Sequence, residues 1–320
     1  MGQRDDFIKR LEQLNGGPLR FGDRRPDEVA AIERNGRDKH ENGQTPTVKS
    51  SSPISYPRMV PHTTPPTPPP VVQPVQRAFV ALNDALPGQD VTVPERGRLY
   101  LIETPLARMT EDRSLLRAAM QRALADASSP LQQRFLARYD KPMALDNLLF
   151  VDLETTGLSH SPLFLIGTMV WENDDFVVKQ YLARHYGEEA AVIAAFFALA
   201  KERGLLISFN GKSFDMPYVR NRSIANGVPI RLELPHFDLL HESRRVWKRC
   251  LPNCKLQTLE QMVCGHPPRH GDIPGSQIPE AYHSFVRNGN ALRLAKIIHH
   301  NLLDLVTLAE LLTKLPPLES

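Results

Sequence analysis

The stretch from Leu148 to Leu158, LLFVDLETTGL, determines how the rest of the chain is interpreted. Its apolar run is typical of a buried strand, yet the run carries Asp152 and, two residues later, Glu154. Side chains two residues apart in a strand point to the same side, so both carboxylates project together. Aspartate is depleted in strands, and two like charges on one face repel unless a cation lies between them. A solvated strand end would look the same, so this motif alone is a weak signal.

The segments after this stretch predict an α/β fold. Two strands follow in close succession, which predicts an antiparallel meander. A helix that ends before Gly204 then leads to a parallel strand, and the rest of the chain is mostly helical. This order is that of a ribonuclease H-like fold, with a mixed five-stranded sheet flanked by helices. The predicted segments are the strands Leu148–Leu153, Leu163–Trp171, Phe176–Leu182, Leu205–Phe209 and Ile230–Phe237, and the helices Glu188–Arg203 and Ala291–Leu315.

Two further acidic residues lie where this fold would bring them near Asp152. Asp215 follows a strand and the Asn210-Gly211 turn, near the start of a helix, where an anion is favoured. Asp304 lies in the apolar C-terminal helix, so its charge needs a partner. Each has an ordinary alternative, a first-turn aspartate and a salt-bridged aspartate respectively.

Taken together, the four carboxylates predict a site for two Mg²⁺ or Mn²⁺ ions, which prefer oxygen ligands. Two such ions can stabilise both the attacking and the leaving oxygen of a phosphodiester, and a nearby base can accept the proton of water. His300 lies four residues before Asp304 on the same helical face and is the best-placed base. His299, five residues before Asp304, is the alternative.

The succession DxE, NxxxFD and a base followed by Asp resembles the DEDD superfamily of 3′–5′ exonucleases. More narrowly, the chain resembles the YprB-type predicted exonucleases with a ribonuclease H-like domain, over about Leu148–Leu315. The segments that carry the resemblance are FVDLETTGLS, FLIGTMVW, SFNGKSFDMPYVRNR, LPNCKLQTLE, GDIPGSQIPEAY and HNLLDLVTLAEL.

The resemblance implies that the metal ligands are Asp152, Glu154, Asp215 and Asp304. The superfamily's Tyr subclass has its base four residues before the last Asp, where this chain has His300. The His subclass has its base five residues before, where this chain has His299. The NxxxFD spacing is similar to that of the Tyr subclass and favours His300, but both histidines stay open.

Basic residues near this region predict contacts with phosphate. The segment His241–Lys255 reads as a helix whose apolar side includes Cys250 and whose opposite side is cationic. Asn210 and Lys212, beside Asp215, are expected to contact the substrate strand. A solvated helix face is the competing interpretation of the cations, which are Arg244, Arg245, Lys248 and Arg249.

Composition divides the chain into three parts. Of its 28 prolines, 12 fall in residues 1–75, which we expect to be a disordered, proline-rich linker. We expect residues 76–145 to form a small hairpin and a helical region. We expect residues 146–316 to form the ribonuclease H-like exonuclease domain. No apolar run approaches the roughly 18–20 residues of a membrane span, and the start has no apolar signal segment. Three cysteines are too few for a disulfide framework, so we expect a cytoplasmic protein without membrane contact.

The sequence therefore predicts a metal-dependent 3′–5′ exonuclease that hydrolyses single-stranded DNA or RNA by a two-metal mechanism. A single strand is expected because a terminal nucleotide must enter a narrow carboxylate pocket. One alternative is a catalytically weak nucleic-acid-binding module. The other is an interaction scaffold that binds a protein partner through the proline-rich arm. Apposed buried charges are costly without a metal, which argues against both alternatives.

Overall fold

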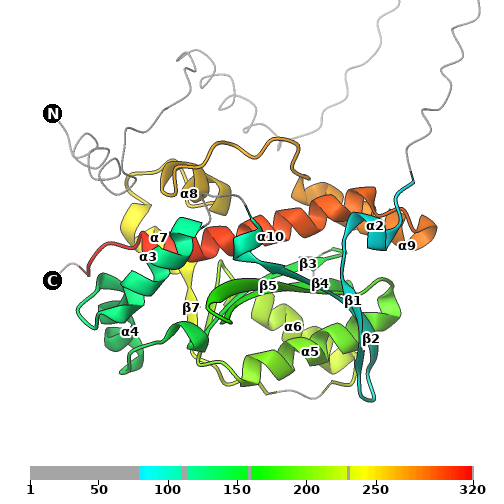
Figure 1. Cartoon of the computed structure of the whole chain (residues 1–320), viewed down its shortest axis with the longest axis horizontal. Helices are drawn as coiled ribbons and strands as arrows, with labels where there is room; N and C mark the ends of the chain where they lie inside the picture. The colour runs from blue at the N-terminus through cyan, green and yellow to red at the C-terminus, as the bar shows by residue number, and fades with distance from the viewer. Residues whose placement is uncertain (1–78, 110–113, 158–159, 229–230, 319–320) are drawn as a thin grey trace, which may run out of the picture. The chain divides into compact units, whose positions relative to one another are not determined.

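The computed structural model describes residues 79–109, 114–157, 160–228 and 231–318 (Figure 1). The predicted proline-rich linker lies outside these residues. Within them, no helix is both long enough and apolar enough to span a bilayer.

One mixed sheet of seven strands organises the described part of the chain, in the order β1-β2-β5-β4-β3-β6-β7. The meander β3, β4 and β5 is antiparallel, while β6 and β7 run parallel to β3. The α/β mixed-sheet prediction is thereby confirmed. The strands are β1 (Gln89–Val93), β2 (Gly97–Pro105), β3 (Leu148–Thr155), β4 (Leu163–Glu172), β5 (Asp175–Leu182), β6 (Leu205–Ser208) and β7 (His236–Asp238).

The sheet has two more strands than predicted. The hairpin β1–β2 joins it because the free edge of β5 pairs antiparallel with β2, from Tyr100 opposite Leu182 to Pro105 opposite Val177. The hairpin thus continues the sheet of the predicted nuclease domain across the boundary expected near residue 145. The strand predicted over Ile230–Phe237 is shorter in the structure, where β7 covers only His236–Asp238.

Helices cover both faces of the sheet. Figure 1 shows α10 and α3 on one side, and α5 and α6 on the other. The helices are α2 (Leu82–Ala85), α3 (Ser114–Ala125), α4 (Pro130–Tyr139), α5 (Glu189–Lys201), α6 (Asp215–Ala225), α7 (Leu239–Trp247), α8 (Leu256–Met262), α9 (Ile278–Asn288) and α10 (Leu292–Thr313), with single 3₁₀ turns η3 (Leu106–Arg108), η5 (Leu145–Asn147), η6 (Tyr186–Glu188) and η7 (Gly275–Gln277).

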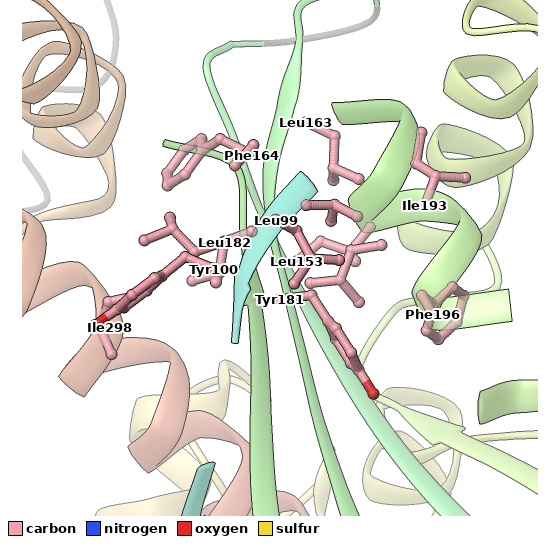
Figure 2. Packing of buried hydrophobic residues seen from close by; sticks show 14 of the residues in the cluster. Leu99, Tyr100, Leu153, Leu163, Phe164, Tyr181, Leu182, Ile193, Phe196 and Ile298 are labelled. Atoms are coloured by element: carbon pink, nitrogen blue, oxygen red, sulfur yellow. The ribbon is translucent and has the colours of Figure 1, made fainter. Parts of the chain in front are cut away.

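Successive side chains along each strand point to opposite faces of the sheet, so apolar side chains pack against the helices on both faces. Figure 2 shows Ile298 of α10 packing on one side of the sheet and Ile193 and Phe196 of α5 on the other. All three side chains are almost fully buried. Because β3 is apolar on both faces and central in the sheet, the polar groups at its carboxyl end are surrounded by packed structure.

A buried aspartate fixes the loop that follows β6. The fully buried Asp238 carboxylate accepts hydrogen bonds from the backbone N–H groups of Asn210 at 2.9 Å, Lys212 at 3.0 Å and Leu240 at 3.0 Å. One side chain therefore caps α7 and holds the Asn210–Lys212 turn against the end of β7.

We expect Asp238→Asn to destabilise the protein by about 1–3 kcal/mol, because the amide nitrogen cannot accept the N–H bonds that a carboxylate oxygen accepts. Urea unfolding followed by circular dichroism would measure this change. Asp146→Asn, at an exposed aspartate in η5, should stay within about 0.5 kcal/mol of the wild type. Equal stability of the Asp238 variant and the wild type would contradict the role of this cap.

Candidate active site

Strand β3 presents two carboxylates at its carboxyl end. Asp152 is half-buried and Glu154 is buried, and both line a hollow of about 420 Å³. His300 and Asp304 of α10 line the same hollow. The register of β3 and β4 shifts between Glu154 and Thr155, which ends the regular pairing beside the carboxylates.

The close approach of α10 to the sheet depends on Gly167 of β4. Gly167 lies opposite Asp152 in the strand register. A Cβ atom at Gly167 would overlap the side-chain amide of Asn301, so only glycine leaves room for this amide. The Asn301 amide nitrogen donates to the Asp152 carboxylate at 2.8 Å and to its backbone oxygen at 3.2 Å. Asn301 thus ties α10 to β3 and orients Asp152.

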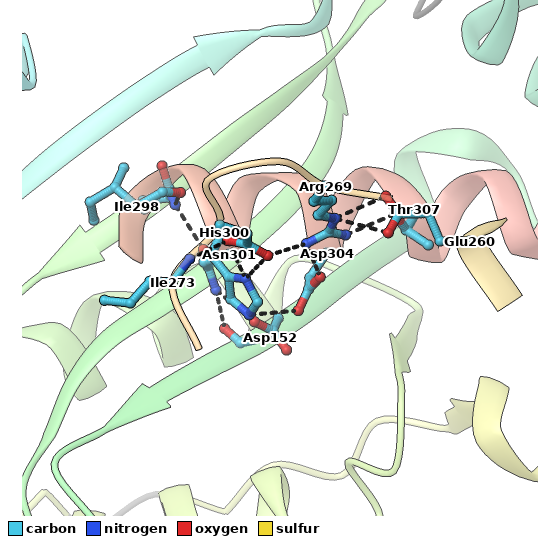
Figure 3. A network of polar contacts seen from close by, with 11 residues as sticks. Asp152, Glu260, Arg269, Ile273, Ile298, His300, Asn301, Asp304 and Thr307 are labelled. Carbon is cyan, nitrogen blue, oxygen red and sulfur yellow. Dashed lines mark hydrogen bonds and ion pairs between the residues drawn. The ribbon is translucent and has the colours of Figure 1, made fainter. Parts of the chain in front are cut away.

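On the next turn of α10, Asp304 has two basic neighbours (Figure 3). One oxygen lies 2.7 Å from Nη1 of Arg269, and the other lies 3.5 Å from Nε2 of His300. The Arg269 guanidinium also contacts Glu260 at 2.9 Å. Arg269 therefore supplies the positive charge that a partly buried Asp304 requires.

Asp215, at the start of α6, does not line this hollow, but its charge acts on both Asp152 and Glu154. It follows a tight turn in which Asn210 has a φ of 66°. A Cβ atom at Gly211 would overlap Ser208 and would lie 2.9 Å from the Asp215 carboxylate. The turn therefore packs directly against Asp215, which is buried.

Burial and mutual repulsion make the carboxylates resist ionisation. Burial, followed by the nearby charges of Asp304, Glu154 and Asp215, raises the pKa of Asp152 well above its usual value. Burial and the charges of Asp304 and Asp215 do the same to the pKa of Glu154. Burial raises the pKa of Asp215 to about 7. The four predicted carboxylates thus share one electrostatic environment.

A second hollow, of about 510 Å³, adjoins the first. Both hollows share Asp152 and Asp304, and the second is also lined by Asn210 and Arg244. Lys255, the last residue of the predicted basic segment, lines it as well. The two hollows therefore meet at Asp152 and Asp304.

The other predicted substrate contacts lie elsewhere. Arg245 is paired with the buried Glu242 at 2.5 Å, and Glu242 also binds Arg134 and Arg138. The exposed side chains of Lys212, Lys248 and Arg249 line neither of the two hollows.

The structure separates the two candidate histidines. His299 is exposed and lines a different hollow, bounded by Lys296 and Leu303, whereas His300 faces the carboxylates. The expectation that Cys250 lies on an apolar helix side is wrong, because α7 ends at Trp247 and Cys250 is exposed.

Sequence reasoning missed three residues that contact the site: Asn301, Arg269 and Asp272, whose carboxylate lies 2.8 Å from Nδ1 of His300. Each acts through contacts between segments far apart in the chain. Two signals were available: an asparagine within the mostly apolar α10, and Asp272 within the segment GDIPGSQIPEAY.

The donor set fits a hard divalent cation, because its ligands would be carboxylate oxygens. Among the residues that the structure describes, however, no three Asp, Glu, His or Cys side chains form a ready cluster around one point. Asp304 shares its charge with Arg269 at 2.7 Å.

A family model of the RNase H superfamily matches residues 149–316, slightly more than half of the chain. The chain belongs to this superfamily, in agreement with the fold. A curated relative is the uncharacterized protein YprB of Bacillus subtilis (strain 168), which is 36% identical over 171 residues. The match covers 52% of this chain and 41% of that protein, so the chain spans well under two thirds of its relative.

Among solved structures, the chain is similar to the family B DNA polymerase of the archaeon Pyrobaculum calidifontis. The two share 18% identity and superpose with a TM-score of 0.44, over 53% of this chain and 24% of the polymerase.

We expect Asp215→Asn to stabilise the metal-free protein at pH 8. An aspartate with a pKa of 3.8 when unfolded and about 7 when folded loses stability as pH rises through this interval. Asparagine removes this loss. The melting temperature should rise by about 2–4 °C for each kcal/mol gained.

Thermal unfolding of both proteins in EDTA, from pH 4 to pH 8, would measure the difference. The gain should be largest at pH 8 and should shrink as the pH falls below 7. A gain independent of pH would show that Asp215 ionises normally. Asp238→Asn provides the matched control, since it should destabilise the fold at pH 8.

Proposed function

We propose that this chain is a metal-dependent 3′–5′ exonuclease that hydrolyses phosphodiester bonds of single-stranded DNA or RNA. The observation that carries the proposal is the hollow where Asp152, Glu154 and Asp304 meet His300. Membership of the RNase H superfamily supports a nucleic-acid substrate.

The carboxylates would hold the cations. Their raised pKa values reflect buried, mutually repelling charges, and divalent cations relieve such repulsion. We expect two Mg²⁺ or Mn²⁺ ions, which when bound supply positive charge to the attacking and leaving oxygens. Their ligands would be Asp152, Glu154, Asp215 and Asp304.

His300 would accept the proton of the attacking water. Its Nε2 lies 3.5 Å from the Asp304 carboxylate, inside the hollow that the acidic groups line. Removal of a proton by a positioned base speeds such reactions by about 10²–10⁴-fold. His299 has no comparable access, because it lines a different hollow.

The shape of the site favours a single strand. The hollows of about 420 and 510 Å³ meet at Asp152 and Asp304, and each has the size of a small-ligand pocket. Nucleotides could occupy both while the scissile phosphate lies at the carboxylates. Arg244 would hold a phosphate in the second hollow.

A catalytically weak nucleic-acid-binding module is the second candidate. One observation favours it: Arg269 already offsets the charge of Asp304, so this carboxylate has a counterion within the protein. Such a module would hold a strand without cleaving it.

Substitution of individual site residues tests the proposed exonuclease activity. We expect the wild type to shorten 5′-labelled single-stranded DNA or RNA from the 3′ end when Mg²⁺ or Mn²⁺ is present. Asp152→Ala and Asp304→Ala should abolish shortening, because each removes a proposed ligand. His300→Ala should reduce kcat by about 10²–10⁴-fold, which gel analysis of timed reactions would measure.

His299→Ala serves as the matched control and should retain wild-type turnover. Turnover lost in His299→Ala but kept in His300→Ala would overturn the choice of base. Metal-independent binding without cleavage, equal in the wild type and Asp152→Ala, would favour the binding module instead.

Substrate contact at the second hollow has a separate test. Arg244→Ala should weaken strand binding and reduce the salt slope of log K by about 1, because one phosphate contact is lost. Fluorescence anisotropy of a labelled oligonucleotide in EDTA at several salt concentrations would measure both. Arg122→Ala, at an exposed arginine of α3, should change neither. An unchanged slope in Arg244→Ala would exclude the phosphate contact.

A further inference from the structure

The loop between α8 and η7 passes beside α10 and directs a carboxylate at His300. Nδ1 of His300 lies 2.9 and 2.8 Å from the two carboxylate oxygens of Asp272. One of these oxygens also accepts the backbone N–H of Ile273 at 2.9 Å. Both His300 and Asp272 are only 13% exposed, so the contact is largely shielded from water.

This contact favours hydrogen on Nδ1 of His300. An ionised carboxylate can only accept hydrogen bonds, so Nδ1 must donate to Asp272. A neutral imidazole with hydrogen on Nδ1 has its lone pair on Nε2. That atom is the one that faces Asp304 and the hollow.

We propose that Asp272 is a positioning residue, which holds His300 in the Nδ1–H tautomer and directs Nε2 into the carboxylate hollow. The catalytic consequence rests on the proposed nuclease function, whereas the tautomer and the orientation do not. A carboxylate behind a histidine base acts in this way in other hydrolytic enzymes.

The loop that carries Asp272 is held in place by Arg269 (Figure 3). The Arg269 guanidinium binds the buried Glu260 at 2.9 Å and Asp304 at 2.7 Å. It also lies 3.8 Å from Asp272 and 3.3 Å from the Thr307 hydroxyl. The buried side chain of Ile273 fixes the loop on the other side of Asp272. The loop is therefore anchored before Asp272 by Arg269 and after it by Ile273, and these two contacts fix the position of the Asp272 carboxylate.

A different role for Asp272 would be that of a fifth metal ligand, since its charge is close enough to act on Glu154. The contacts favour positioning, because both Asp272 oxygens face Nδ1 of His300. The two roles predict different effects on Mn²⁺ binding.

The experiment uses Asp272→Asn in the full-length chain, with Asp272→Glu as the conservative variant. Long-range ¹H–¹⁵N NMR of the histidine side chains in EDTA reports the tautomer of each ring, and His300→Gln assigns the His300 signals. Isothermal titration with MnCl₂ measures metal affinity, and timed digestion of 5′-labelled single-stranded DNA gives kcat and KM.

We expect the wild-type His300 signals to show hydrogen on Nδ1, and Asp272→Asn to shift them toward the Nε2–H or a mixed state. Mn²⁺ affinity should stay within about threefold of the wild type. The value of kcat should fall by about 10²–10⁴-fold with little change in KM, and Asp272→Glu should recover part of it. His270→Ala, at an exposed residue of the same loop, should leave every readout unchanged.

Unchanged His300 signals in Asp272→Asn would overturn the proposal. A loss of Mn²⁺ affinity as large as that of Asp152→Asn would assign Asp272 to the metal instead. If the wild type cleaves neither DNA nor RNA, the proposed nuclease function fails, while the NMR result still decides whether Asp272 sets the tautomer. If the Asp272→Asn chain does not fold, the wild-type spectrum decides: hydrogen on Nδ1 of His300 would support the proposal, and hydrogen on Nε2 would overturn it.

Discussion

The site depends on the close contact between β3 and α10, which forces like charges together. The side chains of Asp152 and Glu154 from β3 and of Asp304 from α10 line the same hollow. Burial raises the pKa of both strand carboxyl groups. Such an arrangement costs folding free energy unless positive charge or hydrogen-bond donors offset it. Packing of apolar side chains on both faces of the sheet supplies the stabilisation that holds it.

Neutral and cationic groups moderate this repulsion in different ways. Asn301 donates to Asp152 through an amide that has space only because Gly167 has no side chain. Arg269 places a full positive charge against Asp304. The acidic site is thus partly compensated within the protein.

Local sequence patterns predicted much of the architecture, because they depend on near neighbours. Alternation along β3 indicated that Asp152 and Glu154 share a side, and both line one hollow. Helical spacing placed His300 near Asp304, and Nε2 of His300 lies 3.5 Å from that carboxylate. The pairing of the hairpin with β5 was not predictable in this way, since an edge strand accepts any partner with free backbone groups.

By itself, the sequence determined the α/β class, the order of its main strands and the acidic residues near their ends, because hydrophobic periodicity and turn residues act locally. Only the tertiary structure decided which groups surround those acids. Asn301 meets Asp152 across 149 residues of chain, and His300 meets Asp272 across 28. Contacts of this kind leave no local periodicity, since they form only when separate segments pack against one another. For the same reason, the choice between His299 and His300 required the structure, which shows the two rings facing different hollows.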